Sequence, residues 1–405
     1  MDQVTIGARL RVLRRWRGMT QVQLAGLSGL NQSVISMIEN GQRSLDRRSQ
    51  IAAVAAALRV SETDLVGGPH LTADPLQSGP HAGIPALRVA LQTNTLTAPT
   101  ADRARPLAEL ARILADEIEP LSYAGDAIEM LSLLSPVIDE LHVHTAAPAD
   151  EAAHRLALET LVEACYIAMN RSKDLGYHDL AHAAATRATE AAQLLGEPAA
   201  LGKAAFLSIQ TMPRDGSWNR TLAAAGRAAG ALEPHARDAL GRQVLGMLTL
   251  SAALAAASVN REDLASDWLG EAAGIAGRLP DAPVASWAAF SATNVGIWRV
   301  AIAVEQGAAG AAVLELASPV DRGKAALRKS RYATFLADIG RGLAREPKTR
   351  PDAIRWLRQA EDTAPQMIRN SAAARESVAY LLNRARATAG GSELRGMAAR
   401  MGVPH

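Results

Sequence analysis

The sequence is poor in cysteine and in aromatic residues, and each shortage excludes a class of protein. Cys165 is the one cysteine among 405 residues, so an intrachain disulfide cannot form and a cysteine-rich metal site is excluded. Aromatic residues make up only 3% of the chain, whereas 48% of residues are hydrophobic and alanine, leucine and arginine are abundant. This mixture favours helices that pack closely through small side chains. We therefore predict an all-α protein.

Long apolar runs are also missing. No segment holds 18 uncharged apolar residues, and residues 1–4 do not begin a basic stretch that leads into an apolar run. We therefore expect neither export nor a membrane span, and we place the protein in the cytoplasm, where a reducing environment suits the single thiol. At 405 residues the chain is too long for one small core and is expected to form at least two domains.

The charge is unevenly distributed along the chain. The whole chain has a net charge of +2, but residues 1–66 hold nine arginines and five acidic residues and so carry +4, which leaves −2 on the remainder. A short basic head on a slightly acidic body is typical of a nucleic-acid-binding domain joined to a separate module.

Residues 1–66 are predicted to form five short helices. Thr20 and Gln23 have the spacing of a capping box, which begins the second helix. Gly29 then supplies a tight turn, and Asn31 precedes a third helix that ends at Asn40 and the glycine after it. The local signals are consistent with one another over the whole segment.

Two stretches of this segment, MTQVQLA at 19–25 and GLNQSVISMIENG at 29–41, resemble the lambda-repressor-like helix-turn-helix family, also called the XRE family. The resemblance covers residues 5–66 and combines a T-Q-x-x-L-A start, a glycine turn and an I-x-x-I-E-N-G ending. It implies that the third helix enters the major groove of double-stranded DNA.

The resemblance also assigns roles in reading bases. It implies that Gln32, Ser33 and Met37 face base edges. Gln32 is the best candidate for specificity because its amide donates and accepts at once, which matches adenine. Many relatives have a long polar side chain at the position of Met37, so a base contact there would be apolar.

Other residues match family positions that hold the DNA backbone. Gln21 is expected to bind phosphate at the start of the second helix, with help from Ser36. Arg43 and Arg47 follow the recognition helix where relatives contact the backbone or the minor groove, and Arg48 is an alternative to either. Glu39 and Arg14 match a structural salt bridge, so we assign them to stability.

Beyond the head, residues 67–106 are rich in glycine and proline and are predicted to form a linker with a short helix at 87–91. Residues 107–405 are predicted to be a succession of helices. A worn repeat of small residues occurs at 181–188, 265–272 and 353–360 and resembles the second helix of tetratricopeptide repeats. The assembled chain resembles regulators of high-GC Gram-positive bacteria that join such a head to such a body, which implies a head, a linker and a tetratricopeptide-like superhelix.

Patterns of catalysis and metal binding are weak. His178 and His182 lie four residues apart, as in some zinc sites, but the glutamate of H-E-x-x-H and a third ligand are missing. No G-x-S-x-G motif or P-loop occurs. We predict that the protein is not an enzyme and has no metal or cofactor, and that Cys165 is a buried structural thiol.

A concave helical body commonly binds a peptide or a small molecule. The polar and aromatic residues where we expect such an effector pocket are Asn294, Trp298, Arg299, Arg331 and Tyr332. The alternative for Trp298 and Tyr332 is that they fill the core between helices.

The leading hypothesis is a homodimeric transcription regulator that binds a palindromic operator and associates with the nucleoid when bound. A dimer is expected because one recognition helix reads only a few base pairs, whereas two, spaced by about 34 Å, give useful affinity. The alternative is an interaction scaffold whose body recruits a protein partner and whose DNA-binding head is secondary.

Overall fold

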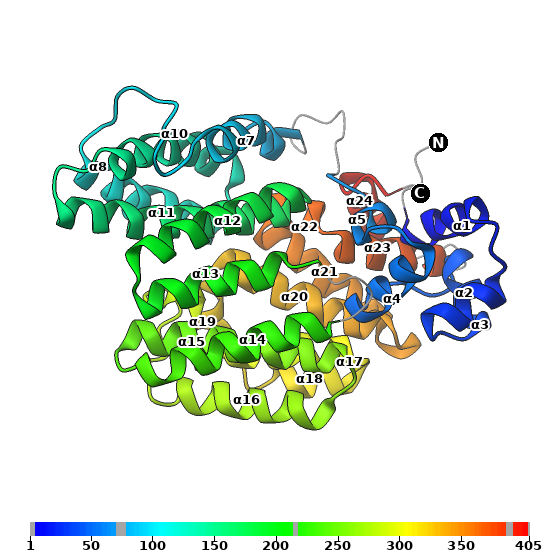
Figure 1. Ribbon diagram of the computed structural model, residues 1–405. Helices are drawn as coiled ribbons and strands as arrows, with labels where there is room; N and C mark the ends of the chain where they lie inside the picture. The colour runs from blue at the N-terminus through cyan, green and yellow to red at the C-terminus, as the bar shows by residue number, and fades with distance from the viewer. Residues whose placement is uncertain (1–4, 70–77, 214–217, 386–391, 404–405) are drawn as a thin grey trace.

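The computed structural model describes residues 5–69, 78–213, 218–385 and 392–403. Every regular element in these ranges is helical, which confirms the all-α prediction. Figure 1 shows a small N-terminal head beside a larger body of stacked helices.

The head contains five short helices around its own core. They are α1 (Ile6–Trp16), α2 (Gln21–Ser28), α3 (Gln32–Glu39), α4 (Arg48–Leu58) and α5 (Glu62–Val66). The capping box of Thr20 and Gln23 forms as predicted, and Gly29 ends α2 in the left-handed region at a φ of 67°. The apolar faces of these helices form one cluster, centred on fully buried residues such as Leu10, Leu24 and Ile35.

The first part of the body stacks antiparallel helices on one another, as Figure 1 shows from α10 down to α16. Its elements are α7 (Ile84–Thr93), α8 (Leu107–Ile113), the π-helical turn η2 (Leu114–Ile118), α9 (Glu119–Ala124), α10 (Ala127–Ala146), α11 (Glu151–Asp174), α12 (His178–Leu195), α13 (Pro198–Thr211), α14 (Asn219–Leu232), α15 (Ala239–Ser258) and α16 (Glu262–Ala276).

The second part returns toward the head. Its helices are α17 (Ala292–Gln306), α18 (Ala311–Ala317), α19 (Arg322–Ala326), α20 (Lys329–Ala344), α21 (Arg350–Thr363), α22 (Pro365–Asn370), α23 (Ala372–Ala385) and α24 (Ser392–Arg400). Short 3₁₀ turns lie at Gly79–His81, Glu233–His235, Trp287–Ala289 and Pro347–Thr349.

Part of the predicted linker is packed against the body. Residues 70–77 lie outside the described residues, but Ile84, Leu87 and Leu91 of α7 are buried in the main core of the body. The helix predicted at 87–91 is therefore longer than expected, and this part of the 67–106 segment is not a free hinge.

The repeated small residues occupy equivalent places in the stack. They lie on α12, α16 and α21, each of which packs against the helix before it: α11, α15 and α20. Their alanines are buried because a small side chain lets two helix backbones approach closely. The relation to tetratricopeptide repeats stays a prediction.

Contacts between the two ends close the superhelix on itself. A ring nitrogen of His81 lies 3.1 Å from the Asn370 side-chain oxygen, and the Ala127 N–H donates to Gln366 at 2.8 Å. The guanidinium of Arg328 stacks on the ring of Tyr123 at 3.8 Å from its centroid. The body therefore encloses a central space.

Helix α15 is long and apolar enough to cross a membrane by length and composition, but 78% of its most apolar window is buried inside the protein. Such burial is typical of a core helix.

Candidate DNA-binding surface and effector cavity

A chain of polar contacts holds the N-terminus of α3 in place. Gln32 donates to the side-chain oxygen of Gln21 at 2.9 Å, and Gln21 donates to the carboxylate of Glu39 at 2.9 Å. Arg14 grips the same carboxylate with two nitrogens, at 2.5 and 2.8 Å. The structure thus brings Gln21 and Gln32 together, and it places Arg14 and Glu39 in the predicted structural pair.

The buried carboxylate at the end of this chain is charged. Burial alone raises the pKa of Glu39, but the hydrogen bonds from Arg14 and Gln21 outweigh burial and hold the pKa below its ordinary value. A fixed carboxylate orients the Gln21 amide, so the amide oxygen faces Gln32.

The remaining predicted contacts on α3 differ in exposure. Ser33 is exposed beside Gln32, whereas Ser36 and Met37 are half-buried. The Asn40 side chain donates weakly to the Ser36 hydroxyl at 3.5 Å. Gln32 and Ser33 are therefore the two members of the set that present their side chains to solvent.

Arginine side chains divide between the outer surface and the body. Arg43 is exposed, as a DNA contact requires. In contrast, the Nε of Arg47 donates to the backbone oxygen of Glu305 in the body at 2.6 Å. The prediction that Arg47 holds DNA needs correction, because its guanidinium is engaged between head and body.

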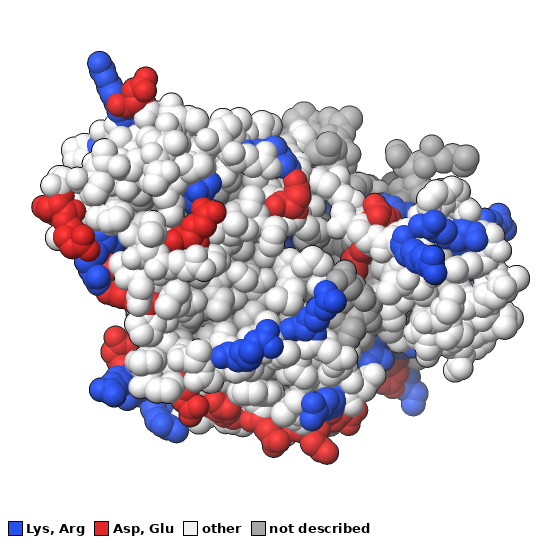
Figure 2. Space-filling view, viewed as in Figure 1, with Lys and Arg blue, Asp and Glu red and all other residues white. Residues whose placement is uncertain are grey.

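In Figure 2, blue surface gathers over α1, while the surface over α2 and α3 in that view carries none.

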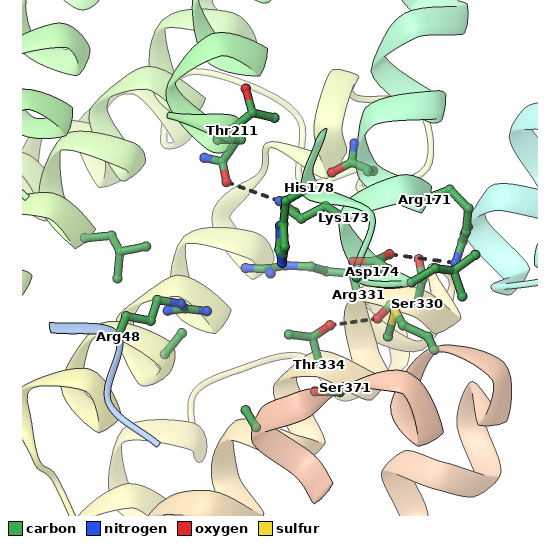
Figure 3. Close-up of a pocket in the computed structure, with 18 of the residues that line it drawn as sticks. Arg48, Arg171, Lys173, Asp174, His178, Thr211, Ser330, Arg331, Thr334 and Ser371 are labelled. Atoms are coloured by element: carbon green, nitrogen blue, oxygen red, sulfur yellow. Dashed lines mark hydrogen bonds and ion pairs between the residues drawn. The ribbon is translucent and has the colours of Figure 1, made fainter. Parts of the chain in front are cut away.

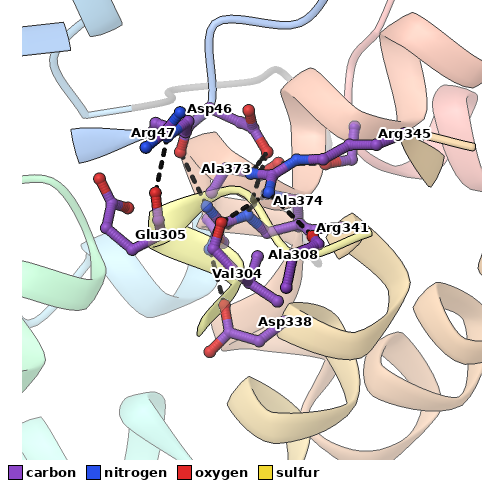
Figure 4. A network of polar contacts seen from close by, with 12 residues as sticks. Asp46, Arg47, Val304, Glu305, Ala308, Asp338, Arg341, Arg345, Ala373 and Ala374 are labelled. Carbon is purple, nitrogen blue, oxygen red and sulfur yellow. Dashed lines mark hydrogen bonds and ion pairs between the residues drawn. The ribbon is translucent and has the colours of Figure 1, made fainter. Parts of the chain in front are cut away.

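A buried ionic network joins the head to the body (Figure 4). Asp46, at 6% exposure, binds the Nη2 of Arg345 at 2.9 Å, and its backbone oxygen accepts from Arg341 at 2.8 Å. Arg341 also binds Asp338 at 2.6 Å. Burial raises the pKa of Asp46, but the charges of Arg345 and Arg341 outweigh it and hold the pKa below its ordinary value.

Two helices of the head have their first N–H groups bound by carboxylates of the body. The first N–H groups of a helix have no partner within it. Glu305 accepts from the N–H of Ser49 at 3.0 Å at the start of α4, where Arg47 supplies no side-chain cap. Glu376 accepts from the N–H of Ile6 at 3.1 Å at the start of α1. These two caps from the body therefore help to fix the orientation of the head.

A cavity of about 1380 Å³ lies inside the superhelix and is lined by both head and body. Figure 3 shows residues of this cavity, with Arg48 entering from the head. The head contributes α4 and α5, among them Arg48, Ile51 and Ala55. A ligand in this space would contact both parts of the protein.

Three of the five predicted effector residues meet in this cavity. Arg331 donates through its Nε to the side-chain oxygen of Asn294 at 2.8 Å, and its guanidinium lies 5.2 Å from the centroid of the Trp298 ring. The other two do not line the cavity: Arg299 is exposed, and Tyr332 is buried in the C-terminal core beside Phe335.

Sequence reasoning missed an aromatic wall of the cavity. The Trp287 ring lies 5.2 Å from that of Tyr166 and 5.5 Å from that of Phe206. Its indole N–H donates to Glu163 at 3.2 Å. Aromatic residues are rare in this chain, so their positions in the sequence were the signal that could have pointed to this wall.

Other candidate groups have structural surroundings. His178 and His182 both line the cavity, but no group of three metal-binding side chains gathers among the described residues. Cys165 is fully buried, and burial raises the pKa of its thiol to about 12.

A protein-family comparison matches the head. Residues 5–66 match the family described as "Helix-turn-helix domain". This part of the chain is therefore a helix-turn-helix domain, at the bounds that the sequence resemblance predicted.

A curated relative matches a stretch of similar length. The uncharacterized HTH-type transcriptional regulator RghRB of Bacillus subtilis (strain 168) is 41% identical over 70 residues, which are 17% of this chain and 50% of that protein. The chain thus spans about half the length of the curated relative it matches.

A solved structure covers more of the chain at lower similarity. The crystal structure of Bacillus thuringiensis PlcR in complex with the peptide PapR7 and DNA covers 67% of this chain and 94% of its own, with 15% identity and a TM-score of 0.24.

Proposed function

We propose that the protein is a sequence-specific DNA-binding transcription regulator of the XRE type, which acts in the cytoplasm as a homodimer and carries a tetratricopeptide-like body that binds an effector. One observation carries the proposal: Gln32 and Ser33 are exposed at the N-terminus of α3 within a matched helix-turn-helix domain, and Gln32 is held by Gln21. An amide fixed in this way is ready to read a base edge.

Dimerisation follows from the size of the reading surface. Helix α3 has eight residues, so one copy reads only a few base pairs. Two copies related by a twofold axis read a palindromic operator whose half-sites are about 34 Å apart. The effector, a small molecule or a peptide, is assigned to the cavity because Asn294, Trp298 and Arg331 meet there.

Operator selection from genomic fragments, followed by footprinting and titration, tests the proposal. We expect a palindromic footprint, and we expect Gln32→Ala to weaken operator binding by about tenfold to a hundredfold while leaving non-specific binding nearly unchanged. Arg43→Ala should weaken both, since a backbone contact is independent of sequence. Gln359→Ala, an exposed glutamine on α21, is the matched control.

Two results contradict the proposal. One is the absence of any selected fragment at low salt, which leaves a scaffold role for the body. The other is unchanged operator affinity in the Gln32→Ala variant while the Gln359→Ala control behaves as the wild type.

A further inference from the structure

Arg331 is a half-buried cation that lines the cavity, and no carboxylate of the described residues forms an ion pair with it. Its Nε is bound to Asn294, but its Nη2 is buried and has no hydrogen-bond partner among the described residues. Within the described ranges no carboxylate lies at ion-pair distance from Arg331, and the nearby Asp338 is engaged by Arg341 at 2.6 Å. Buried charges in proteins are usually paired, so this guanidinium lacks its expected anion.

A second arginine reaches the same cavity from the head. Arg48 is the first residue of α4 and lines the cavity, and its side chain makes no hydrogen bond or ion pair with the described part of the chain. Burial, together with a smaller contribution from the positive charge of Arg48, lowers the pKa of Arg331 to about 10. Figure 3 shows both side chains at this space, Arg48 from the head and Arg331 from α20.

The residues around these two cations suit the apolar part of an organic molecule. Aromatic residues are rare in the chain, with six Trp, five Tyr and three Phe, yet the cavity gathers a large share of them. Those that line it are Tyr123, Tyr166, Phe206, Trp218, Trp287 and Trp298. Aromatic faces provide a large apolar contact area and bind planar groups by stacking. The indole nitrogen of Trp298, whose ring lies under the Arg331 guanidinium, is buried and has no hydrogen-bond partner in the described ranges, so it adds an unused donor.

We propose that the cavity binds a small organic anion, whose anionic group lies between Arg48 of the head and Arg331 of the body and whose apolar part lies against the aromatic wall. The proposal rests on the proposed function in one respect, because it specifies the effector of that regulator. The volume of about 1380 Å³ exceeds the roughly 300 to 1,000 Å³ of common ligand sites, so a drug-sized molecule fits together with water.

The site has a consequence for the head. A ligand bound by Arg48 and Arg331 together contacts the body and α4 at once. It therefore binds the docked arrangement of head and body more tightly than a separated one, and it stabilises that arrangement.

A pair of fluorescent probes tests the assignment in the full-length protein. Anilinonaphthalene sulfonate is an aromatic anion, and N-phenylnaphthylamine is an uncharged molecule with the same ring system. We expect Arg48→Gln and Arg331→Gln each to weaken binding of the sulfonate by about tenfold or more, because each removes one charge-assisted contact. Binding of the uncharged probe should stay within about twofold, and Arg299→Gln, an exposed arginine outside the cavity, should change neither.

The outcomes separate a charge-specific site from a merely apolar one. Unchanged sulfonate affinity in both cavity variants, or an equal loss for both probes in the Arg48→Gln variant, overturns the proposal. If only the Arg331→Gln variant fails to bind both probes, the cavity of that variant has collapsed. The binding of the two probes by the Arg48→Gln variant then tests the proposal. Operator binding by the ligand-free wild type is measured in parallel, so that a failure of DNA recognition is distinguished from a failure of the anion site.

Discussion

The docking of the head depends on Asp46, and replacing it with asparagine should weaken docking without unfolding the head. Asparagine keeps the volume of the side chain but removes the charge that faces Arg345 and Arg341. Arg341 retains Asp338, and Arg345 retains the backbone oxygen of Val304 at 2.5 Å. The cost should therefore lie at the low end of the range for broken buried ion pairs, about 3 kcal/mol.

Hydrogen exchange of the Ser49 amide measures this cost directly. Ser49 is the second residue of α4, so its N–H has no partner inside the helix and is protected by Glu305 of the body. A docking free energy reduced by about 3 kcal/mol should speed its exchange about 100-fold. Amides inside α2 and α11 should keep their rates, because each part has its own core.

An exposed ion pair supplies the control. Asp362 lies 3.0 Å from Arg358 on α21 and is largely exposed, so Asp362→Asn should cost less than about 1 kcal/mol and leave Ser49 exchange unchanged. Unchanged Ser49 exchange in the Asp46→Asn variant would refute the docking argument. So would equal acceleration of every amide, which indicates general unfolding.

Two further predictions concern buried carboxylates. Burial raises the pKa of Glu376 to about 7, although the Ile6 N–H and the charge of Arg9 act in the opposite direction. Docking should therefore be strongest below about pH 4.5, where the carboxyl group is protonated in both states. It should weaken by up to about 3 kcal/mol as the pH rises through 7. Glu376→Gln should abolish this slope in Ser49 exchange, corrected for intrinsic rates, between pH 5 and 8; a wild-type slope of opposite sign contradicts it. Arg14→Met leaves the carboxylate of Glu39 buried without its ion pair and should destabilise the head by about 3–5 kcal/mol in thermal unfolding, while operator preference is retained at temperatures where the head stays folded.

Local patterns predicted the head well because its signals lie within a few residues of one another. The capping box at Thr20 and the turn at Gly29 depend on neighbouring positions alone. The partner of Arg47, in contrast, lies 258 positions further along the chain, and no local pattern signals that contact. The resemblance to DNA-binding relatives predicted that Arg47 contacts DNA. It covers only the head and therefore contains no information about contacts with the body.

Two of the five predicted effector residues do not line the cavity, and the reason is geometric. Successive residues of a helix point about 100° apart, so two neighbours seldom face one space. Trp298 and Arg331 line the cavity, while Arg299 and Tyr332, each one position later, point to solvent and to the core. Identifying the right member of each pair requires the helix orientation, which packing sets.

Helix α4 connects the proposed ligand to the recognition helix. Its start is capped by Glu305, its first residue Arg48 lines the cavity, and its length packs on α2, which in turn packs on α3. A ligand present at a hundred times its dissociation constant stabilises the docked head by about 2.7 kcal/mol. This is comparable to the cost of about 3 kcal/mol expected for Asp46→Asn. Linkage then requires the operator to change the affinity for the ligand by the same factor as the ligand changes the affinity for the operator. If operator DNA leaves ligand affinity unchanged, docked and undocked heads bind DNA equally, and the contact between head and body carries no signal.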